Sequence, residues 1–202
     1  MTQTPSLSRL IRKEVERLPE GEPITAKRLL HLGSRAAIDQ ALTRMARRGQ
    51  LTRLSRGFYV CPVVTRFGTR APEIGKTVQA LAQALGETIV AHGAVAANTL
   101  GLSTQVPIRP IYLTSGSSRR LKLGGQVVEL RHAPAWQLAE PKGPAGEILR
   151  ALCWAGPVQA PALLRDIHHR LPTETRRSLA GLRAGMPGWM AKTVSEAMTA
   201  DA

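Results

Sequence analysis

Three kinds of side chain are scarce in this sequence, and each shortage narrows the range of functions. Aromatic residues make up only 3% of the chain, which disfavours binding of single-stranded nucleic acid, because that mode stacks bases on aromatic rings. Cys61 and Cys153 lie far apart and lack metal-ligand spacing, so a reduced cytoplasmic protein is expected rather than a disulfide scaffold. The 14 acidic residues are scattered, and no pair of carboxylates is placed for acid–base chemistry.

The sequence also lacks long apolar segments and recognisable catalytic motifs. No apolar run approaches the roughly 18 residues that cross a bilayer, and no apolar signal core opens the chain. The five histidines show no ligand spacing, and His168 and His169 would point in different directions on a helix. His92 is expected to be a hydrogen-bonded structural residue, and the loop 115–118 lacks the lysine of a phosphate-binding loop. We therefore expect a cytoplasmic protein that is not an enzyme, binds no membrane and needs no cofactor or metal.

Positive charge, by contrast, is abundant and concentrated toward the N-terminus. The chain has 28 lysines and arginines against 14 aspartates and glutamates, a formal net charge of +14. Residues 1–70 contain 14 basic and five acidic side chains, whereas residues 71–202 contain 14 and nine. Arginine predominates, and its planar guanidinium pairs with phosphate or guanine better than the lysine ammonium does. This distribution predicts a nucleic-acid partner for the N-terminal part.

Residues 24–60 have the pattern of a winged helix-turn-helix, with a short helix, a tight turn, a longer helix and a β-hairpin. At the turn, Gly33 is expected to end the first helix with a positive φ, and Ser34 is expected to cap the second. Gly49 is expected to end the second helix, and two β-prone runs then flank a turn at residues 55–57. One face of the second helix is apolar, and its residues are Ala37, Ile38, Ala41, Leu42 and Met45.

The opposite face of this helix is polar and basic, which suits duplex DNA. An α-helix fits the major groove of B-DNA, and residues near its N-terminus reach base edges. The side chains predicted to reach bases are Arg35, Asp39, Gln40 and Thr43. Arginines further along the helix and in the hairpin are predicted to bind phosphate or the minor groove. The candidate DNA-binding residues are Lys27, Ser34, Arg35, Gln40, Thr43, Arg44, Arg47, Arg53 and Arg56.

The chain as a whole is predicted to be α+β and to consist of four parts. Residues 1–62 form the winged helix-turn-helix domain, and residues 63–72, rich in Pro, Gly, Thr and Arg, form a linker. Residues 73–140 form a mixed α+β domain, and residues 141–202 form a helical C-terminal extension.

Individual elements follow from the spacing of apolar residues. Leu29 and Leu30 are expected to face the core of the winged domain, and Arg66 and Arg70 of the linker are candidates for phosphate contacts. Gly124-Gly125 is expected to form a hairpin turn. The predicted helices cover residues 7–18, 74–85 and 189–198; a strand and a small-residue helix share residues 88–102; and strands are predicted at 106–114, 119–123 and 126–132.

Several motifs resemble a known family. They are the run Arg56–Pro62 (Arg-Gly-Phe-Tyr-Val-Cys-Pro), the runs Ile89–Gly93 and Ala96–Leu102, and Ile111–Thr114 (Ile-Tyr-Leu-Thr). Together they resemble the AbiEi-type antitoxins of bacterial type IV toxin–antitoxin systems, over roughly residues 5–140.

This resemblance implies a two-domain protein that acts as a transcriptional repressor and an antitoxin. The N-terminal domain would bind inverted repeats of double-stranded DNA in its own promoter. The second domain would oppose a nucleotidyltransferase-like toxin encoded alongside, without necessarily contacting that toxin. The C-terminal extension matches no motif of the family.

Two other classes of function stay open from the sequence. The chain could be a winged protein–protein or RNA-binding module without antitoxin activity, in which the arginines would form only a solvated surface. A nucleic-acid enzyme with a winged targeting domain is disfavoured, because paired carboxylates and metal ligands are missing from the sequence. The neighbouring open reading frame distinguishes these classes, since a nucleotidyltransferase there favours the antitoxin.

Overall fold

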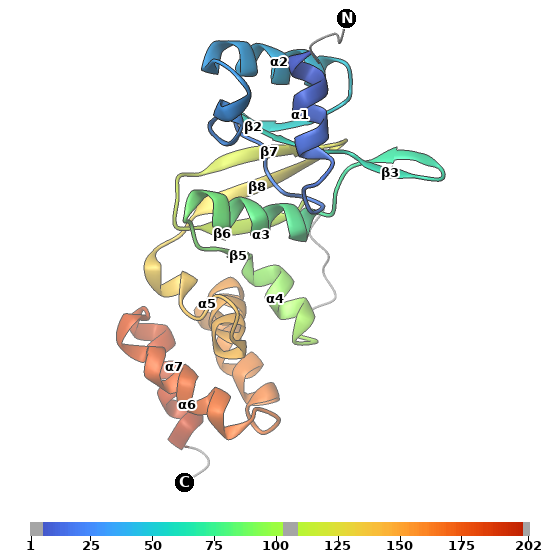
Figure 1. Ribbon diagram of the computed structural model, residues 1–202. Helices are drawn as coiled ribbons and strands as arrows, with labels where there is room; N and C mark the ends of the chain where they lie inside the picture. The colour runs from blue at the N-terminus through green and yellow to red at the C-terminus, as the bar shows by residue number, and fades with distance from the viewer. Residues whose placement is uncertain (1–5, 103–108, 200–202) are drawn as a thin grey trace, which may run out of the picture. The chain divides into compact units, whose positions relative to one another are not determined.

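The computed structural model describes residues 6–102 and 109–199 of the chain (Figure 1). Its fold is mixed α+β, as predicted, with many helices and small sheets. Within the described residues, no helix is both long enough and apolar enough to cross a membrane.

The chain divides into two compact units whose boundaries differ from the predicted domains. Unit 1 comprises Met1–Glu87 and Arg119–Glu129, and unit 2 comprises Thr88–Ser118 and Leu130–Ala202. The prediction had placed the first domain boundary in the segment 63–72. The chain instead leaves unit 1 after helix α3 (Ile74–Leu85), returns to it for a β-hairpin, and leaves it again within strand β8 (Gln126–His132).

Unit 1 combines helices with short antiparallel hairpins. Strand β1 pairs with β2, β3 pairs with β4, and β7 lies next to β8. The elements of unit 1 are α1 (Leu7–Val15), the 3-10 helix η1 (Lys27–Leu32), α2 (Arg35–Arg47), β1 (Thr52–Ser55), β2 (Phe58–Val60), β3 (Val63–Thr65), β4 (Gly68–Arg70), α3 (Ile74–Leu85), β7 (Arg119–Leu123) and the first part of β8 (Gln126–His132).

The predicted apolar stripe of α2 forms the centre of unit 1. Ile38, Ala41 and Leu42 are completely buried, and they share one core cluster with Ile11 and Val15 of α1. Burying an isoleucine or leucine side chain contributes about 1.5–3 kcal/mol to the free energy of unfolding. The helical periodicity predicted for both segments is therefore confirmed.

Two contacts between distant segments complete this unit. Ile24 and Tyr59 exchange two backbone hydrogen bonds, of 2.7 and 3.0 Å, so the chain before η1 adds a short bridge to the edge of β2. Leu123 of β7 packs in one cluster with Leu54 of β1 and Val60 of β2. The second contact explains why the β7 segment belongs to unit 1, although nearly 60 residues separate it from β2 along the chain.

The turn between η1 and α2 agrees only in part with its prediction. The hydroxyl of Ser34 accepts a backbone N–H from the first turn of α2 at 3.3 Å, and Gly49, with φ of 71°, follows the end of the helix, both as predicted. Gly33 is extended, with φ of 161°, so the predicted left-handed conformation was wrong. Leu30, expected in the core, is 48% exposed, because side chains three apart share a face in a 3-10 helix.

The segment 63–72, predicted as a linker, contains the β3–β4 hairpin, which projects from unit 1 (Figure 1). Its turn is closed locally by Thr65, whose hydroxyl donates to the carbonyl of Gly68 at 2.9 Å and accepts from the backbone N–H of Phe67 at 3.2 Å. The prediction weighed the proline and glycine content of this segment. It did not weigh the β-branched residues of β3, which favour an extended strand.

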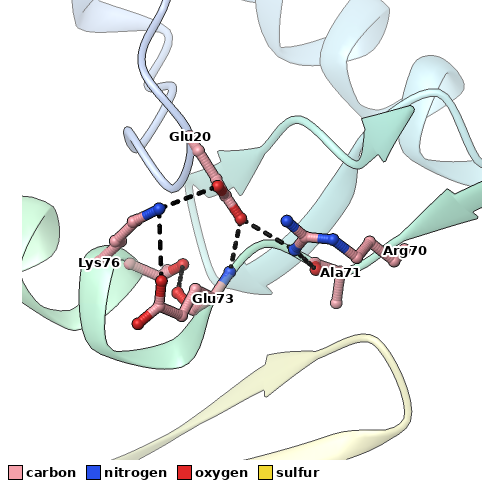
Figure 2. Close-up of polar contacts among 6 residues, drawn as sticks. Glu20, Arg70, Ala71, Glu73 and Lys76 are labelled. Atoms are coloured by element: carbon pink, nitrogen blue, oxygen red, sulfur yellow. Dashed lines mark hydrogen bonds and ion pairs between the residues drawn. The ribbon is translucent and has the colours of Figure 1, made fainter. Parts of the chain in front are cut away.

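Glu20 connects the base of this hairpin to two other segments of unit 1 (Figure 2). Its Oε1 accepts a hydrogen bond from Nη1 of Arg70 at 2.9 Å and from the backbone N–H of Glu73 at 3.0 Å, and its Oε2 accepts from Nζ of Lys76 at 3.2 Å. The Arg70 guanidinium, followed by the Glu73 amide and Lys76, lowers the pKa of Glu20 from 4.5 to about 2. Arg70, a candidate for a phosphate contact, is therefore engaged within the protein.

The lowered pKa of Glu20 predicts a specific loss of stability in acid. Because the carboxylate is favoured in the folded state, its stabilising effect is complete above the unfolded pKa near 4.5 and is lost as pH falls toward about 2. In Glu20→Gln, the protection of α3 amides from hydrogen exchange should therefore change less between pH 5 and pH 2.5 than in the wild type. Glu14→Gln, which removes a carboxylate that makes no ion pair among the described residues, should keep the wild-type profile.

Unit 2 is built from two strands, the end of β8 and a helical C-terminal half. The predictions for β7, β8 and the small-residue helix are confirmed, whereas the strand predicted at 106–114 begins at Ile111, and its part within residues 103–108 lies outside the described residues. The elements of unit 2 are β5 (Ile89–Ala91), α4 (Gly93–Thr99), β6 (Ile111–Thr114), the end of β8, the 3-10 helix η2 (Ala135–Leu138), α5 (Pro144–His168), α6 (Thr173–Gly181), the 3-10 helix η3 (Leu182–Gly185) and α7 (Gly188–Thr199).

The helical extension predicted for residues 141–202 is present as α5, α6 and α7. Helix α5 is interrupted at Gly156, whose φ of 72° is not helical, immediately before Pro157, which has no backbone N–H to donate. The three helices enclose one apolar core that includes Leu149, Leu152, Leu164, Leu179, Met190 and Val194.

Helices α4 and α5 pack closely because both present small residues to each other. Ala96, Ala97 and Ala151 are buried in one cluster. Gly93, the first residue of α4, faces the backbone of Arg150 and the side chain of Trp154 so closely that a Cβ at this position would overlap both. The small-residue helix predicted within residues 88–102 therefore packs tightly against a neighbouring helix.

The close approach at Gly93 predicts that Gly93→Ala destabilises unit 2 by about 1–3 kcal/mol, the usual effect of overpacking. All three tryptophans lie in unit 2, so denaturation followed by tryptophan fluorescence measures this unit. Gly181→Ala is the matched control, because Gly181 has helical φ and ψ and nothing within 4 Å of an added Cβ. That variant should be about 0.4–1 kcal/mol more stable than the wild type. Equal effects of the two substitutions would contradict the packing described here.

Candidate nucleic-acid interface

The exposed face of α2 carries the side chains predicted to meet DNA. Burial of the opposite face against α1 fixes the rotation of this helix, and the Ser34 cap fixes its first turn. A shallow, open depression on the exposed face is lined by Asp39, Gln40, Thr43, Arg44 and Arg47. The structure therefore brings together four of the candidate DNA-binding residues, and Asp39 with them, along one side of α2.

Arg35 is held by a neighbouring acid within the same helix. Its Nε donates a hydrogen bond to Oδ2 of Asp39 at 3.2 Å, and the two side chains are 67% and 49% exposed. Exposed ion pairs of this kind contribute only about 0–1 kcal/mol. An anionic or hydrogen-bonding ligand can therefore draw the guanidinium away from Asp39 at small cost.

Thr43 is less available than its position on the helix predicted. Its hydroxyl donates to the backbone carbonyl of Asp39 at 2.8 Å and lies 3.4 Å from the hydroxyl of Tyr59 on β2. The side chain is half-buried, and it connects α2 to the hairpin. Thr43 is thus placed to fix the helix against β2, and contact with a base would compete with these bonds.

The other predicted cations remain on the surface of unit 1. Lys27 lies on η1, Arg53 lies on β1 opposite Tyr59, and Arg56 lies in the β1–β2 turn, all with exposed side chains. Within the described residues, none of these three forms an ion pair, and the same holds for Arg44 and Arg47 of α2. Their positive charges are therefore available to an external anion.

A second group of cations was missed by the analysis of the sequence. Arg9, Arg12 and Lys13 of α1 line an open groove together with Arg48, which follows α2. The signal was visible in the sequence as three basic residues spaced three and four apart, the spacing that places side chains on one helix face.

Among the described residues, no group of three or more His, Cys, Asp or Glu side chains could hold a metal. His92 caps α4, its Nδ1 accepting the N–H of Ala94 at 3.3 Å. Burial, assisted by the charge of Arg131, lowers the pKa of His92, which keeps the ring neutral as this cap requires. Burial also raises the pKa of the thiols of Cys61 and Cys153.

Comparison with known proteins places the chain in a family. A family model described as a family of unknown function, DUF6088, matches residues 10–157. The chain belongs to DUF6088. The matched segment includes η1, α2 and the β1–β2 hairpin with every predicted contact residue, and it ends one residue after the interruption of α5 at Gly156. Helices α6 and α7 lie outside it, and no curated protein or solved structure matches this DUF6088 chain.

Proposed function

We propose that this chain is a sequence-specific repressor that binds double-stranded DNA in its own promoter and acts as the antitoxin of a type IV toxin–antitoxin system. Unit 1 would be a winged helix-turn-helix in which α2 enters the major groove and the β1–β2 turn contacts the backbone or the minor groove. Unit 2 would oppose a nucleotidyltransferase-like toxin encoded alongside. Cytoplasmic location and the absence of catalytic activity are part of the same proposal.

The observation that carries the DNA-binding proposal is the presentation of α2 by its neighbours. The helix follows η1 after a two-residue turn, is capped by Ser34, and buries its apolar face against α1, so its polar face is held outward on a rigid support. The hairpin that follows is bridged to Ile24 before η1. The order α1, bridge at Ile24, η1, α2 and β1–β2 hairpin supports the proposal that unit 1 is a winged helix-turn-helix.

The exposed arginines of unit 1 also support the proposed binding of duplex DNA. Arg44 and Arg47 on α2 and Arg53 and Arg56 on the hairpin are exposed and make no ion pair among the described residues. Arginine pairs well with phosphate, so these side chains suit contacts to the duplex backbone on both sides of the helix. Gln40, also exposed on α2, can form two hydrogen bonds to adenine, and Arg35 can do so to guanine.

The antitoxin part of the proposal rests on the resemblance of Arg56–Pro62 and the β5–α4–β6 motifs to AbiEi-type antitoxins. Two of these motifs lie in the densest part of unit 2, where α4 packs on α5 through Gly93 and its alanines. The small residues of these motifs thus have a structural reason of their own in this chain. Genetic rescue is therefore needed to test the antitoxin activity.

Substitutions on α2 test the mode of DNA recognition. Arg35→Ala or Gln40→Ala should reduce the discrimination between the protein's own upstream DNA and random duplex by about 1–3 kcal/mol, the value of a lost bidentate base contact. The measurement is an electrophoretic shift titration on both duplexes at one salt concentration.

Arg53→Ala and Arg56→Ala are the matched substitutions on the hairpin. They should weaken binding to both duplexes equally, because contacts to phosphate carry no sequence information. If the hairpin variants lose discrimination while the α2 variants lose affinity uniformly, the docking proposed here is reversed. If the wild type binds no duplex at low salt, DNA binding itself is excluded, and a protein–protein or RNA-binding module becomes the better assignment.

The antitoxin activity is tested in cells that express the neighbouring nucleotidyltransferase-like toxin. The wild-type chain and Arg35→Ala/Gln40→Ala should both restore growth, because unit 2 is intact in each. Gly93→Ala should restore growth less well, since it disturbs the packing of α4 in unit 2, while Gly181→Ala should act as the wild type. Loss of rescue in the α2 variant with full rescue by Gly93→Ala would place the activity in unit 1.

A further inference from the structure

The groove between α1 and the chain after α2 is distinct from the exposed face of α2. It is an open concavity of about 890 Å³, and four of its lining side chains are cationic. Three of these, Arg9, Arg12 and Lys13, lie on one face of α1, and the fourth, Arg48, follows the C-terminus of α2. The groove residues Ser6, Ser8 and Gln50 add hydroxyl and amide groups, which also donate hydrogen bonds to phosphate oxygens.

The four cations of the groove lack the acidic partners that other cations of unit 1 have. Elsewhere in the unit, Arg28 pairs with Glu22 at 2.8 Å, and Arg70 and Lys76 pair with Glu20. Within the described part of the chain, none of the four groove cations forms an ion pair, and Glu16 is the one carboxylate among the residues that line the groove. An external anion would relieve the mutual repulsion of these four cations.

The stability of the individual helices explains the positions of these four cations only in part. Positive charge is favourable near a helix C-terminus, which accounts for Arg12 and Lys13 in the last turn of α1 and for Arg48 after α2. Arg9, however, lies in the first turn of α1, where a cation is unfavourable, and it has like charges three and four residues further along. Ser6 occupies the N-cap position of α1, yet its side chain makes no capping hydrogen bond.

The position of the groove suits nucleic acid that α2 already holds. Helix α2 has 13 residues, so the groove at its C-terminal end lies about 20 Å from the base-reading end. Gln50 lies two residues before Thr52, the first residue of β1, so the groove lies at the end of the β1–β2 hairpin opposite the turn that carries Arg56. A duplex lying along α2 would therefore bring flanking phosphates to this end of unit 1.

We propose that this groove is a second binding site for duplex DNA, which takes the sugar–phosphate backbone that flanks the sequence read by α2. The proposal rests on the proposed DNA-binding function and extends it to residues outside the turn motif and the hairpin. Arginine forks bind phosphate oxygens in pairs, so Arg9 and Arg12 each contribute a directed contact, and Lys13 contributes a point charge. The groove supplies affinity without sequence preference.

The test compares Arg9→Gln/Arg12→Gln/Lys13→Gln with the wild type on a 40-bp duplex of the protein's own upstream DNA. Each lost phosphate contact should reduce the slope of log K against log salt by about 0.9, so the triple variant should lose about 2.7. The ratio of affinities for upstream and random duplex should stay unchanged. Hydroxyl-radical footprinting should show that protection is lost at the flank and kept at the centre.

The matched control removes three exposed cations from unit 2, in Lys142→Gln/Arg165→Gln/Arg177→Gln, and should keep the wild-type slope. Arg9→Lys/Arg12→Lys retains the charge of the groove and should keep most of the slope. If the triple variant fails to fold, Arg9→Gln alone should still reduce the slope by about 0.9.

Three results would overturn the proposal. An unchanged slope in a folded triple variant, with the α2 variants still losing discrimination, removes the groove and leaves the proposed function intact. An equal loss in the unit 2 control shows that net charge alone is responsible. In the third result, the wild type binds poly-glutamate but no duplex, and the triple variant loses the binding to poly-glutamate. The groove is then a site for acidic protein, and the proposed DNA-binding function is also removed.

Discussion

Burial of one face of α2 determines which side chains of unit 1 can meet a ligand. Ile38 and Leu42 are completely buried against α1, and a period of 3.6 residues then directs Arg35, Gln40 and Arg44 to the surface. Turning the helix by one position would bury a guanidinium and expose an isoleucine, which costs several kcal/mol. The hydrogen bonds that Thr43 makes to its own helix and toward β2 secure the same orientation. The polar exposed surface of α2 is thus a consequence of the core beneath it.

Elements set by local spacing were predictable from the sequence, and elements set by distant contacts were not. The periods of α1, α2 and α3 and the Ser34 cap depend on residues within a few positions of each other, and all were found as expected. Leu30 was misplaced because the spacing does not reveal that η1 is a 3-10 helix. The packing of Leu123 against Val60, which draws β7 into unit 1, joins residues about 60 positions apart and has no local signature.

The residues of the candidate site, too, were predictable only where local spacing determines their position. The basic face of α2 and the exposed arginines of the hairpin follow from helical spacing and turn chemistry, so the sequence was sufficient to find them. The hydroxyl of Thr43 is engaged because Tyr59 lies beside it, and that proximity depends on the pairing of β2. The groove cations of α1 were visible as a pattern, but their convergence with Arg48 required the packing of α1 on α2.

The two basic surfaces of unit 1 differ in how their charges are balanced. On α2, Arg35 is paired with Asp39, so the face that would read bases carries a carboxylate that repels phosphate and can accept a hydrogen bond from cytosine. In the groove, none of the four cations has an acidic partner among the described residues. If α2 reads bases as proposed, this carboxylate would penalise wrong sequences, which is how specificity is gained at the expense of affinity. Unbalanced cations at the flank then restore affinity for any sequence, so under the proposed function the two surfaces would divide these tasks.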